Sequence, residues 1–269
     1  MEFPISFIDY GETEHERRKM MQGKVDTLSF QGRNIYVYTP PSYEREGEVS
    51  FPAIYVQDGN YLFMDSIETL EEDFVQGVTQ EVIFVGIEPI ERNREYTPWK
   101  AEPLVKQNYL GGEGDEYLAF ITEKVMPFVQ SHYRIIRDYA QTGIGGGSFG
   151  ALISLYAAFQ KPGFFGRFAL MSTSLWYENF VSFVEKNKLS QENIRIYMYV
   201  GEQEGVGRTN LQQYMVPNTK KTYERLKEKV FGGAKDVLLE TDPNGVHNHA
   251  FFIQYFPHAV QFLYPGLKS

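Results

Sequence analysis

Hydrophobic positions along the chain fall into two alternating patterns. Short continuous apolar runs, typical of strands buried in a parallel sheet, are separated by segments in which apolar residues recur every three or four positions. The expected strands cover residues 51–56, 81–87, 168–174, 194–200 and 237–240. The expected helices cover residues 116–133 and 219–231, and a last helix ends at Tyr264. This alternation predicts an α/β fold with a mainly parallel sheet and helices on both faces.

The amino-terminal part has a different pattern. Residues 24–39 alternate as in two short strands around a turn at Gln31-Gly32-Arg33, and Pro40-Pro41 ends this hairpin. The sequence has no internal repeat, no low-complexity tract and no linker rich in Pro, Gly or Ser. We therefore expect one domain over residues 1–269.

A glycine-crowded turn at residues 146–150 is the strongest chemical signal. Gly146-Gly-Ser148-Phe-Gly150 matches G-x-S-x-G, the nucleophile elbow, between an expected strand and an expected helix. A serine on so sharp a turn needs neighbours without a Cβ two positions before and after it, so that strand and helix can approach. Ser148 is therefore the candidate nucleophile. The alternative is an ordinary glycine-rich connection in a strand–helix unit.

A serine hydroxyl needs a base within hydrogen-bond reach, and the base needs a carboxylate to orient it. After a nucleophile elbow the expected order is Ser, then Asp or Glu after a later strand, then His in a late loop. Of the five histidines, only His247 and His249 follow the final expected strand, and we favour His247 as the general base. A metal site at these two histidines lacks a third ligand with recognisable spacing.

The acid is expected at the end of the strand over residues 194–200. Glu202 and Glu204 both follow this strand and precede the late histidines. The remaining candidates are Asp236 and Asp242. The pattern of residues alone leaves this choice open.

The turn that follows the strand over residues 51–56 is a candidate part of an oxyanion hole. In this type of fold, one backbone N–H comes from a loop after an early strand and the other from the residue after the nucleophile. These requirements point to Asn60 or Gly59 and to Phe149. The alternative is a plain turn in which Asp58 and Gly59 serve only the turn geometry.

The long segment over residues 88–114 contains three prolines and mixes basic with aromatic side chains. Loops of this length inside a compact domain are usually functional or disordered. We expect it to form a wall of the substrate site, with Arg94 or Arg92 contacting a polar or anionic group. The alternative is a pair of solvated surface charges.

Composition narrows the functional class. A formal charge of −9 without Lys/Arg blocks argues against nucleic acid as a partner. The chain has no cysteine, which excludes disulfides and a thiol nucleophile. The amino terminus does not resemble a signal peptide and no run of eighteen apolar residues occurs, so we expect a cytoplasmic protein with no membrane association. The expected partner is a small-molecule ester, no metal or other cofactor is required, and nothing in the sequence indicates an oligomeric state.

Several motifs in order resemble one esterase family, which includes enterochelin esterases, trilactone siderophore hydrolases, feruloyl esterases and S-formylglutathione hydrolases. The resemblance extends from about Gly32 to Tyr264. The matching motifs are Ile35-Tyr-Val-Tyr-Thr-Pro-Pro41, Tyr55-Val-Gln-Asp-Gly-Asn60, Val85-Gly-Ile87, Arg94-Glu-Tyr-Thr-Pro-Trp99, Gly146-Gly-Ser-Phe-Gly150, Ser172-Thr-Ser-Leu-Trp176, His247-Asn248 and Phe256-Pro257.

The resemblance implies an α/β-hydrolase fold and carboxylic ester hydrolysis by way of an acyl-enzyme. The family's Gly-x-x-Asp/Glu pattern falls on Glu204, and its late-loop histidine falls on His247. It also makes Arg94, Trp99 and Trp176 candidate substrate contacts and a siderophore-type or other polar ester a candidate substrate. The alternative within esterases is a short-chain esterase of broad specificity.

The chain also departs from the family pattern. His249 stands where family members often have Glu, and Phe252 stands where they often have Trp. These departures affect the expected shape of the pocket floor more than the chemistry. The alternative functions are a non-catalytic binding protein of the same fold and an acyltransferase that uses the same residues.

Overall fold

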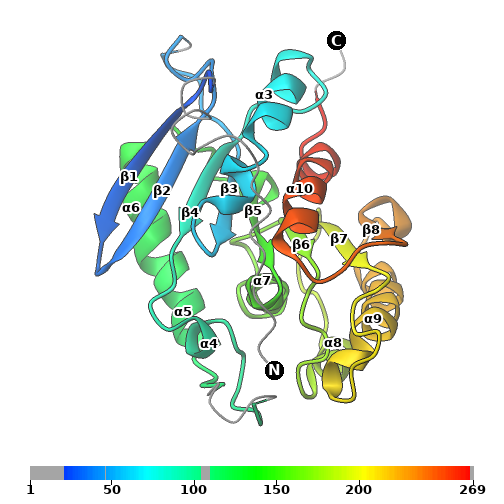
Figure 1. Ribbon diagram of the computed structural model, residues 1–269. Helices are drawn as coiled ribbons and strands as arrows, with labels where there is room; N and C mark the ends of the chain where they lie inside the picture. The colour runs from blue at the N-terminus through cyan, green and yellow to red at the C-terminus, as the bar shows by residue number, and fades with distance from the viewer. Residues whose placement is uncertain (1–20, 46, 104–109, 267–269) are drawn as a thin grey trace, which may run out of the picture.

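One eight-stranded sheet organises the protein. The computed structural model describes residues 21–45, 47–103 and 110–266. The strand order is β1-β2-β4-β3-β5-β6-β7-β8 (Figure 1). The strands are β1 (Lys24–Phe30), β2 (Arg33–Thr39), β3 (Ala53–Gln57), β4 (Ile83–Ile87), β5 (Thr142–Gly147), β6 (Arg167–Met171), β7 (Arg195–Gly201) and β8 (Val237–Asp242). Only β2 pairs in antiparallel fashion, with β1 and with β4, and the pairs from β4 to β8 are all parallel.

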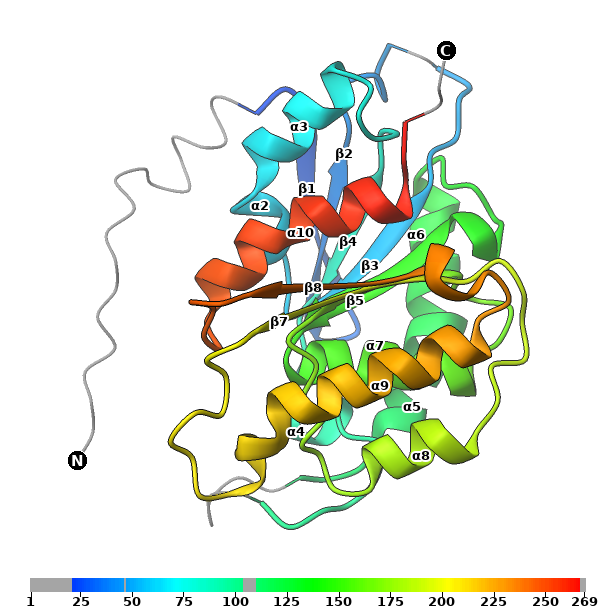
Figure 2. The same ribbon diagram turned by 90° about the vertical axis from the view of Figure 1, so that its right-hand side faces the viewer.

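Helices cover both faces of this sheet (Figure 2). One face carries α2 (Tyr61–Met64), α3 (Ile67–Val75) and α10 (His249–Leu263). The opposite face carries α5 (Gly114–Phe120), α6 (Met126–His132), α7 (Phe149–Gln160), α8 (Phe180–Lys186) and α9 (Met215–Lys229). The one-turn helix α4 (Arg92–Glu95) lies in the connection between β4 and α5. The predicted α/β fold with a mainly parallel sheet is therefore confirmed.

Some of the helices differ from the expectation. The helix expected over residues 116–133 is interrupted by a π-helical turn at Ile121–Val125. Pro127 in the next turn has no N–H to donate to a carbonyl four residues earlier, which favours such an interruption. Helix α3 was not anticipated, although Ile67, Leu70 and Phe74 are buried at helical spacing.

The carboxyl ends of the parallel strands position the candidate site. The loops after β3, β5, β7 and β8 all leave the sheet at this edge, because parallel strands point the same way. Residues far apart in the sequence, from residue 58 to residue 248, are thereby brought to one edge of the sheet.

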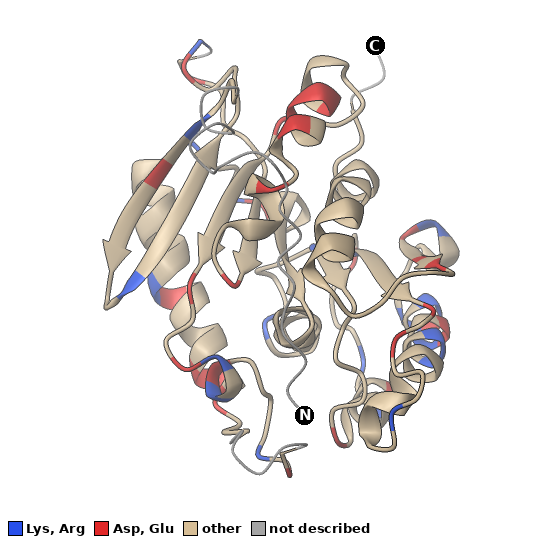
Figure 3. Ribbon diagram, viewed as in Figure 1, with Lys and Arg blue, Asp and Glu red and all other residues tan. Residues whose placement is uncertain are grey.

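Charged side chains are concentrated away from this sheet core. In Figure 3 both signs are interspersed on the outer helix α9, where Lys227 pairs with Glu224 and Arg225 with Glu228. In the part of the chain that the structure describes, we find no helix long and apolar enough to cross a membrane.

Candidate active site

Ser148 stands on a sharp turn between β5 and α7. Its backbone has φ 58° and ψ −116°, a conformation that residues other than glycine rarely adopt. A Cβ on Gly146 would lie 2.9 Å from the backbone of Gly150, and a Cβ on Gly150 would lie 2.9 Å from Gln57. Only glycine at both positions lets the helix start this close to strands β3 and β5, as the sequence pattern predicts.

Ser148, His247 and Glu204 form a continuous hydrogen-bonded chain. The Ser148 Oγ lies 2.9 Å from His247 Nε2, and His247 Nδ1 lies 2.7 Å from Glu204 Oε2. With Nδ1–H donated to the carboxylate, Nε2 is left to accept from the serine hydroxyl. This geometry suits removal of the serine proton by the imidazole.

Glu204 is held rigidly in a buried position. It is only 3% exposed, and its Oε1 accepts hydrogen bonds from Ser172 Oγ at 2.5 Å and from the Gly201 N–H at 2.9 Å. These donors satisfy the oxygen that His247 does not use, so the buried carboxylate has hydrogen-bond partners on both oxygens. Ser172, which has φ 47°, is thus a supporting residue of the site.

The other carboxylates lie elsewhere. Glu202 accepts from Thr241 Oγ1 and lies 3.7 Å from Lys220 Nζ. Asp236 pairs with Arg195, and Asp242 accepts from the Tyr255 hydroxyl. Of the four carboxylates that the sequence left open, the structure brings only Glu204 to His247.

One of the two expected oxyanion loop donors is already used. The Gly59 N–H donates to the Ile87 carbonyl at 2.9 Å, because the loop after β3 packs on the end of β4. This bond contradicts the expectation that Gly59 could serve as a donor. Asn60 at the start of α2 and Phe149 at the start of α7 have backbone N–H groups that bond no other described residue.

The segment over residues 88–114 contacts the site through Arg92. Its Nε and Nη2 donate to Asp58 at 2.6 and 2.8 Å, and Nη2 lies 3.5 Å from the Gly147 carbonyl oxygen. Burial by itself would lower the pKa of Arg92, but the bonds to Asp58 outweigh burial and raise it. Arg94 instead pairs with Glu113 at the surface and lines neither cavity at the site. Residues 104–109 of this segment lie outside the described residues.

The two candidate tryptophans have different surroundings. Trp99 packs against the rings of Tyr156, Tyr177, Phe180 and Phe183. Its indole N–H donates to the Glu178 carbonyl at 3.0 Å. It therefore supports the fold, and it does not line either cavity at the site. Trp176 contacts the Phe149 ring at 5.4 Å and lines a cavity beside His247.

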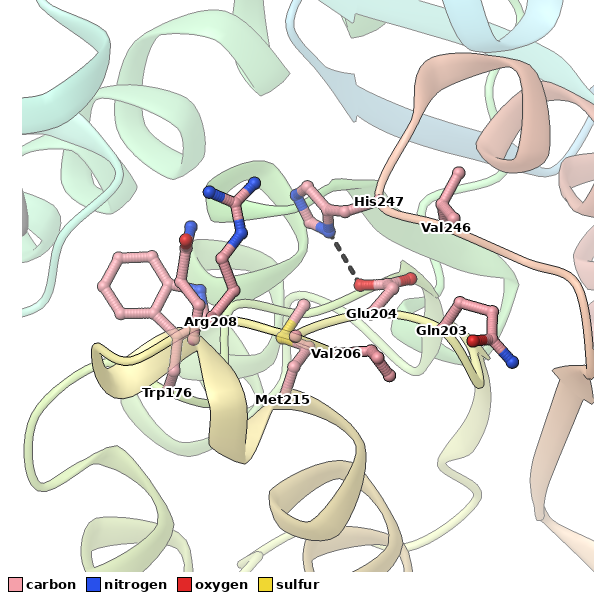
Figure 4. A pocket seen from close by; sticks show the side chains of 10 residues that line it. Trp176, Gln203, Glu204, Val206, Arg208, Met215, Val246 and His247 are labelled. Carbon is pink, nitrogen blue, oxygen red and sulfur yellow. Dashed lines mark hydrogen bonds and ion pairs between the residues drawn. The ribbon is translucent and has the colours of Figure 1, made fainter. Parts of the chain in front are cut away.

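Two open cavities meet at His247. The first, of about 480 Å³, is lined by Ser148, His247, Asp58, Tyr61, Arg92, His249 and Phe252. The second, of about 320 Å³, is shown in Figure 4 and is lined by His247, Glu204, Gly205, Trp176, Gln203, Val206, Arg208, Gln212, Met215 and Val246. Ligands larger than one ester group therefore have space on both sides of the imidazole.

His249 and Phe252 form part of the floor of the first cavity. His249 stacks on Tyr61 with ring centroids 4.7 Å apart, and burial lowers its pKa. Phe252 presents its ring edge-on to His247 at 5.2 Å. A Cβ on Gly147 would lie 2.6 Å from Phe252, so this glycine permits the close approach.

Sequence reasoning missed four contributors to the site. Ser172 and Ser174 lay in a motif that gave them no role, yet Ser172 bonds Glu204 and the Ser174 Oγ lies 3.1 Å from the Ser148 Oγ. In the sequence, Asp58 indicated only a turn, and Arg208 indicated only an exposed charge. Among the residues that the structure describes, no group of three or more His, Asp or Glu side chains could hold a metal ion.

Comparisons with known proteins identify the family. Residues 30–263 match the family model described as "Putative esterase". The chain belongs to this esterase family. As a member it is a carboxylic ester hydrolase with the α/β-hydrolase fold, which confirms the predicted family and enzyme class.

The share of the chain that matches differs from one relative to the next. It is 36% identical over 251 residues to the uncharacterized protein YbbA of Bacillus subtilis, covering 93% of this chain and 99% of that protein. It is 30% identical over 165 residues to the siderophore enterobactin esterase of Emericella nidulans, covering 54% of each. The solved siderophore hydrolase EstA of Aspergillus nidulans superposes with a TM-score of 0.71 at 20% identity, covering 98% of both chains.

Proposed function

We propose that the protein hydrolyses its ester through an acyl-enzyme on Ser148. The observation that carries this proposal is the unbroken hydrogen-bonded chain from Ser148 Oγ through His247 to the buried Glu204. Three side chains from the ends of β5, β7 and β8 meet with the spacing that nucleophilic catalysis needs.

The proposed reaction has two halves. Ser148 Oγ attacks the ester carbonyl carbon while His247 Nε2 takes the hydroxyl proton, and the tetrahedral oxyanion accepts from the N–H groups of Phe149 and Asn60. As the intermediate collapses, the ester C–O bond breaks and His247 gives the proton to the leaving alcohol. Water then attacks the acyl-enzyme with His247 again as base, which releases the acid and restores Ser148. Glu204 keeps the imidazole in the required tautomer and stabilises its charged form.

The substrate that we propose is a siderophore-type or similar polar ester with more than one ester group. The relative of Emericella nidulans is a siderophore enterobactin esterase, and that of Aspergillus fumigatus is a siderophore triacetylfusarinine C esterase. Two cavities that meet at His247 suit a molecule that extends on both sides of the ester being cleaved.

The geometry disfavours a non-catalytic binding protein. That function would be favoured if Ser148 and His247 were far apart or if both glutamates faced solvent, whereas the two side chains are 2.9 Å apart and Glu204 is buried. An acyltransferase would use the same residues and differ only in the acceptor that attacks the acyl-enzyme.

Steady-state hydrolysis of p-nitrophenyl butyrate and of a trilactone tests this proposal. We expect Ser148→Ala and His247→Ala to lower kcat by about 10⁴-fold or more. Glu204→Gln should lower kcat by at least about 10²-fold, whereas the matched change Glu202→Gln should have little effect. Hydrolysis by Ser148→Ala at the native rate would overturn the proposed mechanism.

A further inference from the structure

Arg208 lines the cavity of Figure 4, and its positive charge is not paired with any other described residue. Its side chain forms no ion pair and no hydrogen bond within residues 21–45, 47–103 and 110–266. The cavity lining around it includes the indole of Trp176, the imidazole of His247, the carboxylate of Glu204 and several uncharged residues. In the view of Figure 4 the guanidinium lies between Trp176 and His247. An arginine placed there can donate up to five hydrogen bonds to a ligand.

The loop that carries Arg208 is built from a series of tight turns. The Arg208 N–H donates to the Gly205 carbonyl at 3.1 Å, and the Asn210 side chain accepts from the Gln212 N–H at 3.0 Å. Gly205 has φ 80°, and its Cα lies so close to the Gln212 carbonyl that a Cβ would not fit. Backbone bonds therefore fix the place from which the arginine extends.

The other charges at the site are already neutralised or bonded. Arg92 pairs with Asp58 in the first cavity. Glu204 bonds to His247, to Ser172 and to the Gly201 N–H, and it forms no ion pair with Arg208. Among the described residues that line the two cavities, Arg208 is thus the cation without a bonded carboxylate.

We propose that Arg208 is a specificity-determining residue that binds an anionic group of the ester beside the bond being cleaved. This inference rests on the proposed function and names the substrate class of the same site. A carboxylate or phenolate can accept hydrogen bonds from the guanidinium, and a flat ring that carries it can lie against Trp176. The protein has a formal charge of −9, so an anionic substrate needs such a local cation.

The position of the cation also affects the reaction. A positive charge near His247 opposes the imidazolium that forms while the tetrahedral intermediate exists. A bound anionic group offsets this repulsion. Anionic esters should therefore gain in kcat/KM over neutral esters of the same shape.

Two matched pairs of esters test the proposal. Mono-p-nitrophenyl adipate and its neutral primary amide differ on the acyl side, and 4-butyryloxybenzoate and 4-butyryloxybenzamide differ on the alcohol side. In at least one pair we expect the native protein to prefer the anion by about tenfold in kcat/KM. The preference should shrink when NaCl rises from about 20 to about 300 mM, because Arg208 is exposed.

Variants then assign the preference to Arg208. Arg208→Gln should bring the ratio of anionic to neutral kcat/KM close to one, and Arg208→Lys should retain part of it. The control Arg137→Gln removes a charge from an exposed side chain that bonds the Gln130 carbonyl, and it should leave the ratio unchanged.

The outcomes separate this inference from the proposed function. Equal rates for anionic and neutral esters in both pairs, or a preference that persists in Arg208→Gln, would overturn the role of Arg208 while leaving ester hydrolysis intact. Failure of all four esters to react, together with no acylation of Ser148, would instead refute the proposed function.

Discussion

The ion pair between Arg92 and Asp58 joins three parts of the site, and its removal is the most informative perturbation. Asp58 precedes Asn60 in the loop after β3, and Arg92 lies within 3.5 Å of the Gly147 carbonyl oxygen at the elbow. The pair therefore connects the segment over residues 88–114 with the loop that holds Asn60 and with the turn that holds Ser148. Replacing Arg92 with Met keeps the aliphatic stem and removes the charge.

The magnitude follows from the geometry. Two charges 2.6–2.8 Å apart attract by about 6 kcal/mol at an effective dielectric constant of about 20. Because the side chains are 36% and 17% exposed, solvent screening and desolvation reduce the net coupling to about 2 kcal/mol. We expect Arg92→Met to lower the free energy of unfolding by about 3 kcal/mol, since Asp58 is left unpaired. Asp58→Asn should cost about 1 kcal/mol, because Asn tolerates the φ of 64° at this position.

Urea unfolding, followed by tryptophan fluorescence, measures the coupling in a double-mutant cycle. The double variant should lose about 2 kcal/mol, less than the about 4 kcal/mol that additivity predicts. Arg92→Met should also lower kcat for p-nitrophenyl butyrate at least about tenfold, because it would displace the proposed oxyanion donors. Arg94→Met, which breaks the exposed pair with Glu113, is the matched control and should cost less than about 1 kcal/mol. Additive losses in the cycle, together with unchanged kcat, would refute this reasoning.

Three further perturbations test the supporting structure. Ser172→Ala removes a donor to the buried Glu204 carboxylate, so kcat should fall about tenfold with little change in KM, as steady-state kinetics will show. Gly150→Ala places a Cβ 2.9 Å from Gln57 and should lower the free energy of unfolding by about 2 kcal/mol, whereas Gly47→Ala, with nothing within 4 Å, should not. Burial lowers the pKa of His249 below 6.5, so its contribution to stability is present above that pH and is lost as the pH falls through the folded pKa. His249→Gln should therefore flatten the decline in urea stability between about pH 8 and pH 5.

The fold was predictable because its signals are local. The buried strands read as continuous apolar runs, and β3 and β4 are buried along their whole length. The nucleophile elbow was predictable because only glycine fits at residues 146 and 150. The order of serine, acid and histidine then reduced the candidates for the base to two residues.

The remaining features depend on tertiary contacts that no local pattern records. Glu202 and Glu204 both follow the same strand, and only the family resemblance favoured Glu204 over Glu202. The turn after β7 buries Glu204 and leaves Glu202 near Lys220. Gly59 was expected as a donor, but the register of β3 beside β4 engages its N–H with Ile87. The choice of Arg92 over Arg94 depends on the one-turn helix α4, which directs one side chain to Asp58 and the other to the surface.

Direct identification of the acylated residue tests the central claim most sharply. The protein is incubated with a fluorophosphonate, and tryptic peptides are analysed by mass spectrometry, with Ser148→Ala and His247→Gln treated in parallel. The account predicts one adduct per chain on Ser148, no adduct in Ser148→Ala and much slower labelling in His247→Gln. An adduct on another residue, or an unlabelled Ser148 in folded protein, would contradict it.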